Sequence, residues 1–89
     1  MGTGDEVNHR NVMPVYRQVA ALLGARIAGG EFPPGRLLPS ERELAAQYRV
    51  AVGTIRHALQ LLREEGLIVT EPGRGSGANP DMQKPRPPS

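Results

Sequence analysis

The chain has 89 residues, of which 38% are hydrophobic, with no cysteine, no tryptophan and a formal net charge of +2 at pH 7. This length allows one small domain with a core of Leu, Ile, Val and Ala, and leaves no room for a deep catalytic cavity. Without cysteine, disulfides and thiolate metal sites are excluded. No apolar run approaches the roughly 20 residues that span a bilayer, and the polar N-terminus does not resemble a signal peptide. We therefore expect a soluble, cytoplasmic protein.

The basic balance of the chain is carried almost entirely by arginine. Ten of the eleven cationic residues are Arg, and the sequence pI is about 9.7. Arginine suits bidentate contacts with phosphate and guanine, but a net charge of this size is weak support for nucleic-acid binding by itself. Whether the chain binds nucleic acid must therefore be judged from the positions of the arginines in the sequence.

The first ordered element is predicted after a short arm. Residues 1–12 show no periodicity and are expected to be disordered. From Pro14 the apolar residues fall on one helical face, and Gly29-Gly30 supplies a left-handed C-terminal cap. Gly24 lies inside this helix at a cost of about 1 kcal/mol against Ala, which favours close packing at that point. The residues of the apolar face are Val15, Val19, Leu22, Leu23 and Ile27.

The stretch 38–65 has the pattern of a helix-turn-helix. Pro39 ends the preceding segment, and Ser40 with Glu43 forms a capping box that starts a helix over about 40–48. A tight turn at 49–53 leads to a second helix over about 52–65. Its apolar side contains Ile55, Ala58, Leu59 and Leu62, and its polar side contains Thr54, Arg56, His57, Gln60 and Arg63. Such a unit places its second helix in the major groove of DNA.

A β-hairpin is predicted directly after this helix. Leu67–Thr70 is rich in β-formers, Glu71–Gly75 is a turn, and Ser76–Ala78 is a short return strand. The fold class is therefore mainly α with a small β-hairpin: a winged helix-turn-helix of three helices plus a wing, over residues 13–78. Residues 79–89 hold four prolines and are expected to form a disordered, weakly basic tail.

These residues, in order, resemble the N-terminal winged-helix domain of GntR-family bacterial transcription regulators. The resemblance covers residues 14–77, and its most specific part is the string 38–45. It is carried by Pro14–Val19, Ile27, Gly29-Gly30, Pro34-Gly35, Leu38–Ala45, Thr54–Leu59, Glu65–Ile68 and Gly73–Gly75.

The resemblance implies a dimeric repressor that reads a palindromic operator in double-stranded DNA. It implies DNA contacts by Arg42 at the start of the second helix, by Ala51–Thr54 and Arg56 of the recognition helix, and by Gly73 and Arg74 of the wing. The full set of expected DNA-binding residues is Ser40, Arg42, Ala51, Val52, Gly53, Thr54, Arg56, His57, Gly73, Arg74 and Gly75.

The chain also departs from the family pattern. Ala51 and Val52 stand where Ser or Thr and then Arg are usual, so we expect less direct base readout. Gly77-Ala78 replaces the usual Phe-Val, so we expect a frayed return strand. Nothing after Ala78 resembles the usual effector-binding and dimerising domain. We therefore expect no small-molecule effector, and a monomer in solution that forms a homodimer on DNA.

Each candidate has a structural alternative. Arg42 is also compatible with a surface ion pair, Arg56 with an ion pair to Glu41 or Glu64, and Thr54 with support of the helix start. His57 is expected to face solvent or phosphate rather than to act as a ligand or base. No carboxylate pair, Ser-His set, metal triad or phosphate loop is present, so we expect no enzyme activity, metal or cofactor.

Two functions fit this pattern. The first is a sequence-specific DNA-binding regulator, and the second is a winged-helix protein-interaction module that does not bind DNA. The first requires Arg42, Arg56 and Arg74 on one surface free of glutamate.

Overall fold

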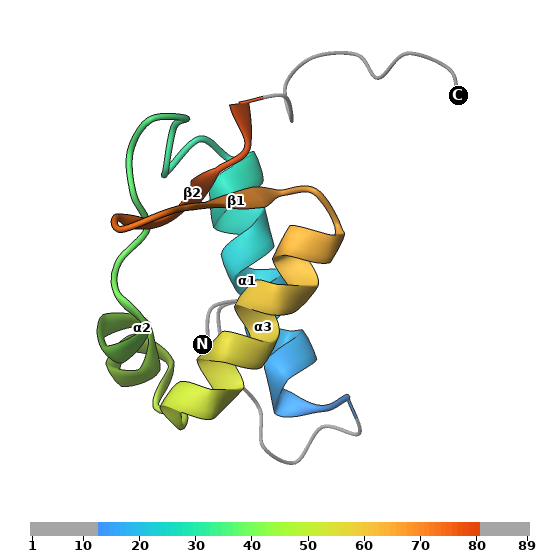
Figure 1. The fold of residues 1–89 in the computed structure, drawn as a ribbon. Coiled ribbons are helices and arrows are strands. Elements are labelled where there is room, and N and C mark those ends of the chain that lie inside the picture. The colour runs from blue at the N-terminus through green and yellow to red at the C-terminus, as the bar shows by residue number, and fades with distance from the viewer. Residues whose placement is uncertain (1–12, 81–89) are drawn as a thin grey trace.

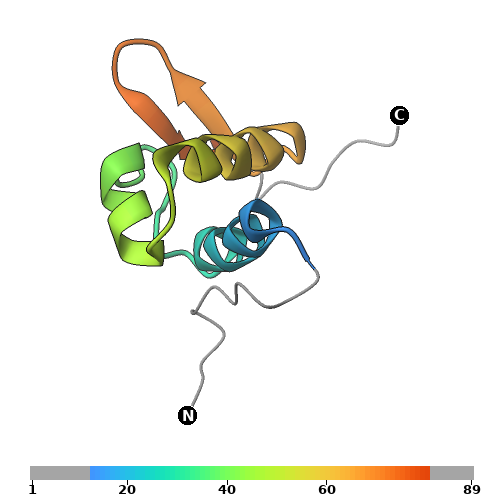
Figure 2. The same ribbon diagram turned by 90° about the horizontal axis from the view of Figure 1, so that it is seen from below.

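The computed structural model describes residues 13–80 as three helices followed by an antiparallel hairpin. Its elements are α1 (Val15–Ala28), α2 (Glu41–Tyr48), α3 (Val52–Glu64), β1 (Ile68–Glu71) and β2 (Gly75–Ala78). The helix α3 packs against α1, and α2 lies beside the N-terminal part of α3 (Figure 1). The hairpin lies on the opposite side of α3 from α1 (Figure 2). The predicted winged helix-turn-helix is confirmed. The arm predicted at 1–12 and the tail from 81 onward lie outside the described residues.

The core is built around one face of α3. Ile55, Ala58 and Leu62 on that face are almost completely buried, and they pack with the predicted apolar face of α1. Gly24 lies at the contact between the two helices, where a Cβ would be 3.4 Å from Leu62 Cδ2, an ordinary packing distance. The buried core residues are Val19, Ala20, Leu23, Ile27, Phe32, Leu38, Leu44, Ala45, Tyr48, Ile55, Ala58, Leu59, Leu62, Ile68 and Ala78.

The predicted caps are present. The Ser40 hydroxyl accepts from the Glu43 N–H at 3.1 Å, and the Glu43 carboxylate accepts from the Ser40 N–H at 3.5 Å, which completes the capping box. At the end of α1, Gly29 is the right-handed C-cap residue, with φ −78°. The left-handed residue is Gly30, with φ +87°.

The turn between α2 and α3 contains a left-handed arginine. Arg49 caps α2 with φ 57° and ψ 49°, and it is the one non-glycine residue with positive φ among residues 13–80. Its N–H donates to the Ala45 carbonyl, which closes the C-terminal turn of α2. The left-handed conformation costs roughly 1–2 kcal/mol for a residue with a Cβ. The turn therefore forms in spite of the residue at this position.

The expectation of a frayed return strand is wrong. β2 pairs with β1 over its whole length, from Ile68↔Ala78 to Glu71↔Gly75. It is also held from the other side, because the Leu38 N–H donates to the Ser76 carbonyl at 2.9 Å and Leu37 forms a bridge with Gly77. A Cβ at Gly77 would lie 3.3 Å from the Arg36 carbonyl oxygen, so the glycine permits this close approach.

Asn79, the first residue after the expected domain boundary at Ala78, is hydrogen-bonded to the segment that follows α3. The Asn79 N–H donates to the Leu67 carbonyl at 3.0 Å, and its side-chain amide donates to the Gly66 carbonyl at 2.9 Å. Asn79, which the sequence pattern assigned to the tail, thus ties the end of the wing to the end of α3.

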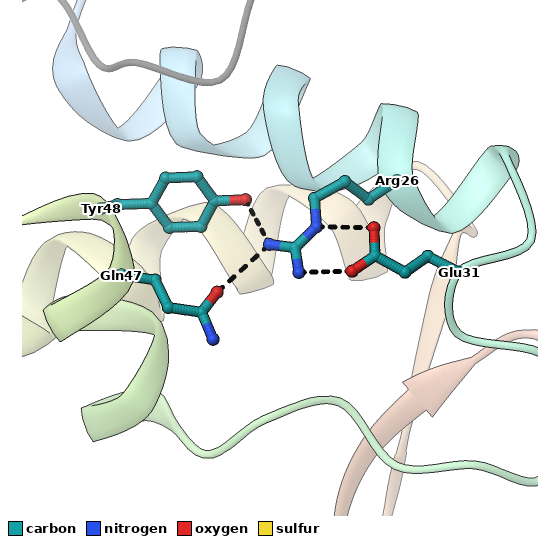
Figure 3. Close-up of polar contacts among 4 residues, drawn as sticks. All are labelled: Arg26, Glu31, Gln47 and Tyr48. Atoms are coloured by element: carbon teal, nitrogen blue, oxygen red, sulfur yellow. Dashed lines mark hydrogen bonds and ion pairs between the residues drawn. The ribbon is translucent and has the colours of Figure 1, made fainter.

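A polar cluster centred on Arg26 joins α1 to α2 (Figure 3). The Arg26 guanidinium donates to both carboxylate oxygens of Glu31, at 3.0 and 2.7 Å, and to the Tyr48 hydroxyl at 2.8 Å. A fourth hydrogen bond reaches the Gln47 side-chain oxygen at 3.3 Å. The guanidinium also lies 5.0 Å from the centre of the Phe32 ring. Hydrogen bonding to Glu31 raises the pKa of Arg26 and lowers that of Glu31.

None of the helices within residues 13–80 is both long enough and apolar enough to cross a membrane.

We predict that Arg49→Gly stabilises the fold by about 0.5–1 kcal/mol, because glycine adopts the left-handed conformation without steric cost. The free energy of unfolding, measured with urea, checks this. Arg49→Ala is the matched control, since it removes the same charge but keeps a Cβ. A gain of equal size for both variants would contradict the backbone explanation.

We predict that Arg26→Gln lowers the free energy of unfolding by about 1–2 kcal/mol, because it removes charge-assisted hydrogen bonds at the α1–α2 junction. Arg63→Gln, on the exposed side of α3, should have little effect. A similar loss from both variants would rule out a specific role for the cluster.

The same cluster predicts a pH dependence. Because the pKa of Glu31 is lowered in the folded state, its contribution is complete above the unfolded pKa of glutamate and is lost as the pH falls through the folded pKa. The stability difference between the wild type and Arg26→Gln should therefore shrink on acidification below about pH 4.

Candidate nucleic-acid interface

The side of α3 opposite the core carries polar and basic residues. Because the apolar residues of α3 repeat three and four positions apart, they turn one face inward and leave the other to solvent. Residues on the free face include Gly53, Arg56, His57, Gln60 and Arg63, all of which are exposed.

The N-terminus of α3 has no side-chain cap. Its N-cap is the exposed Ala51, whose methyl group cannot accept a hydrogen bond. The Thr54 N–H donates to the Ala51 carbonyl at 3.0 Å, and the side chains of Val52 and Thr54 are half-buried. The first N–H groups of α3 are therefore not satisfied by a neighbouring side chain, which leaves a positive helix end facing outward.

Gly53 sits in the first turn of α3 without a reason in the packing of the protein. A Cβ at this position would have no neighbouring atom within 4 Å, and the residue is exposed. Gly77 is explained by a close backbone neighbour, and Gly73 and Gly75 by positive φ. Glycine lowers helix stability relative to alanine. Gly53 therefore destabilises α3, although the space beside it would admit a methyl group.

Arg56 extends from α3 toward the start of α2. Its Nε donates to Glu41 Oε1 at 3.0 Å, one of the two ion pairs that the sequence left open for this arginine. The Arg56 side chain is nevertheless 68% exposed. Exposed ion pairs contribute about 0–1 kcal/mol, so the guanidinium can exchange this partner for another anion.

The wing presents a second arginine between two glycines. Gly73 and Gly75 have φ of +75° and +126°, conformations that favour glycine, and they flank Arg74 in the turn between β1 and β2. Arg74 Nη1 lies 3.2 Å from Glu71 Oε1, and the Arg74 side chain is 63% exposed. The turn itself is closed by the backbone, because the Arg74 N–H donates to the Glu71 carbonyl at 2.9 Å.

A groove of about 310 Å³ joins the wing to the start of α2. Ser40 and Glu41 line it on one side and Arg74, Gly75 and Ser76 on the other, with Leu38, Pro39 and Leu59 completing the wall. Since Glu41 also pairs with Arg56, the structure brings residues of α2, α3 and the wing together. Arg42 follows Glu41 in the same turn and is exposed, and its side chain makes no hydrogen bond or ion pair with other residues in the range 13–80.

The expected surface free of glutamate is not what the structure has. Glu41 and Glu71 each hold one of the predicted DNA-binding arginines. The Glu71–Arg74 pair was missed, although a spacing of three residues across a turn was a usable signal.

His57 is exposed, as expected, and it also makes a ring contact that the sequence did not predict. Its ring stacks on that of Tyr16 from α1, with centroids 3.6 Å apart and an interplanar angle of 6°. Within residues 13–80, no group of three or more His, Cys, Asp or Glu residues could hold a metal ion.

Comparison with known proteins matches most of this chain to one family of bacterial regulatory proteins. The sequence profile described as "Bacterial regulatory proteins, gntR family" matches residues 15–77. The transcriptional repressor NagR of Bacillus subtilis is 40% identical over 70 residues, which cover 79% of this chain and 29% of NagR. The mannosyl-D-glycerate transport/metabolism system repressor MngR of Escherichia coli is 38% identical over 63 residues, covering 71% of this chain and 26% of MngR. The chain thus spans less than a third of these curated relatives.

Solved structures agree with the fold. YtrA from Sulfolobus acidocaldarius, a GntR-family transcription factor, has a TM-score of 0.76 and 34% identity, with 86% of this chain and 81% of that chain covered. The AraR DNA-binding domain in complex with operator ORX1 has a TM-score of 0.70 and 33% identity, with 75% of this chain and 81% of that chain covered.

Proposed function

Because this chain belongs to the GntR family of bacterial regulatory proteins, we propose that it binds double-stranded DNA sequence-specifically and regulates transcription by occupying an operator. The observation that carries the proposal is the convergence of Arg56 from α3 and Arg74 from the wing around the first turn of α2. Exposed arginines contributed by separate elements of one surface are suited to contacts with the phosphates and groove edges of a duplex.

Each element has a distinct role in this proposal. The exposed face of α3 enters the major groove, where Gly53 permits close approach, and Val52 and Thr54 shape the contact with the base edges. Arg42, Arg56 and the N-termini of α2 and α3 contact phosphates or guanines. The wing residues Gly73, Arg74 and Gly75 contact the neighbouring minor groove or the phosphates that border it.

Three features of Ala51, Ser40 and His57 refine these roles. Ala51 has no polar side chain to offer, so the contact at the start of α3 is made by the backbone N–H groups of the first turn. The Ser40 hydroxyl is occupied by the capping box, so its contribution to DNA is the placement of the α2 N-terminus. His57, stacked on Tyr16, supports α3 from the side of α1 and offers its ring edge to a phosphate.

We further propose that the protein acts in the cytoplasm as a repressor and is a monomer in solution. Two copies would then pair on a palindromic operator, because the spacing of half-sites can enforce dimer occupancy. The relatives NagR and MngR carry repressor in their names, and this supports the sign of regulation.

The proposal is tested by selecting bound duplexes from a random pool and then measuring affinity for the selected duplex against salt. If one module neutralises about five phosphates, the logarithm of the affinity should fall with the logarithm of the salt concentration with a slope near −4.5. A scrambled duplex of the same length is the control. Failure to enrich any sequence, with no binding at low salt, would instead favour the protein-interaction module.

We predict opposite effects of Gly53→Ala on folding and on binding. Alanine should raise the free energy of unfolding by about 0.5–1 kcal/mol, because it favours the helix and meets no neighbour within the protein. It should weaken binding to the selected duplex, because the added methyl group occupies the space left for DNA. The measurements are urea unfolding and fluorescence anisotropy. Unchanged affinity would contradict the placement of the first turn of α3 against DNA.

A further inference from the structure

Glu71 stands out among the acidic residues near the proposed interface because its carboxylate pairs with the wing arginine and caps no helix, although its side chain is only 31% exposed and its second oxygen lies beside Gly77. Glu41 also pairs with an arginine, but it lies in the first turn of α2, where a negative charge favours the helix end. Glu71 is the last residue of β1 and has no such role. The turn that follows is held by the backbone hydrogen bond from Arg74 to Glu71 and by the two left-handed glycines.

The contact between Glu71 and Arg74 is a loose one. It consists of a single hydrogen bond at 3.2 Å, longer than the 2.7–2.9 Å typical of charge-assisted pairs. Most of the Arg74 side chain is exposed, and its other donors have no partner in the described part of the chain. The pair therefore holds Arg74 without burying it.

The position of this pair makes it a competitor for DNA. Arg74 lines the groove between the wing and the start of α2, so a duplex lying against both elements would bring phosphates to the same guanidinium. To engage them, Arg74 must leave Glu71 or carry a carboxylate into a strongly negative surface. Both cases reduce the affinity that Arg74 would otherwise provide.

We propose that Glu71 is an affinity-limiting residue of the wing, which holds Arg74 in an ion pair that DNA must displace. This inference rests on the proposed DNA binding. It assigns to one carboxylate a role opposite to that of the arginines around it. The contribution of the wing to DNA affinity therefore depends on how well a given duplex competes with Glu71 for Arg74.

The test is a double-mutant cycle on the selected duplex at low salt, with the full 89-residue chain. Glu71→Gln should raise affinity about two- to fivefold, the range set by the strength of an exposed ion pair. In an Arg74→Gln background, the same change should have no larger effect than Glu65→Gln, which removes an exposed charge at the far end of α3. The salt slope of Glu71→Gln should be steeper by up to about 0.9, the contribution of one more phosphate.

The outcomes separate this inference from the function beneath it. An equal gain from Glu71→Gln in both backgrounds would mean general charge repulsion and would overturn the inference. Unchanged or weaker binding by Glu71→Gln would overturn it as well, and weaker binding would mean that Glu71 prepares Arg74 for DNA. Each of these results leaves the proposed DNA-binding function intact, provided that the wild type binds the duplex. Failure of the wild type to bind any duplex would overturn both. Circular dichroism of each variant confirms that the wing change leaves the fold unaltered.

Discussion

The burial of one face of α3 is the constraint on which the other features depend. Ile55 and Ala58 are completely buried, and Leu62 lies against Gly24 of α1, so the rotation of α3 about its own axis is set by close packing. A core of this kind tolerates little change in volume. The same packing that buries these residues leaves Gly53 and Arg56 on the free side. The residues of α3 proposed to bind DNA are thus exposed because the opposite face of the same helix is buried in the core.

The wing depends on the same principle at longer range. Two strands of four residues each would be marginal alone. Here β2 lies between β1 and the Leu37-Leu38 segment, and Ile68 and Ala78 are buried in the common core. The contact between β2 and the Leu37-Leu38 segment fixes the wing turn beside the start of α2, where Arg74 and Ser40 line one groove. A small residue at Gly77 thus gains backbone contacts that a large side chain there would prevent.

The electrostatics of the surface are balanced rather than simply basic. Among the described arginines, Arg26 forms a bidentate pair with Glu31 and ties α1 to α2 through Tyr48 and Gln47. Arg56 and Arg74, in contrast, are each held by a single contact and remain largely exposed. These two arrangements have different consequences, because a partly buried fork with several acceptors is structural and an exposed single contact is exchangeable. The distinction explains how glutamates can stand inside a surface proposed to bind DNA.

Local rules were sufficient for much of the fold. The capping box at Ser40 and Glu43, the apolar spacing of α3 and the glycine turn of the wing each depend on residues a few positions apart, so the sequence alone determined the helices, the hairpin and the winged helix-turn-helix. The partners of side chains that lie far apart in the sequence were decided by tertiary packing, which also selected one of the two acidic partners that the sequence offered to Arg56. Arg56 finds Glu41 across 15 positions, and Tyr16 meets His57 only because α1 crosses α3. The same holds for Gly77, whose pairing with Leu37 no local pattern shows. Periodicity specifies which face of an element is buried, but which element covers that face depends on how the chain closes on itself.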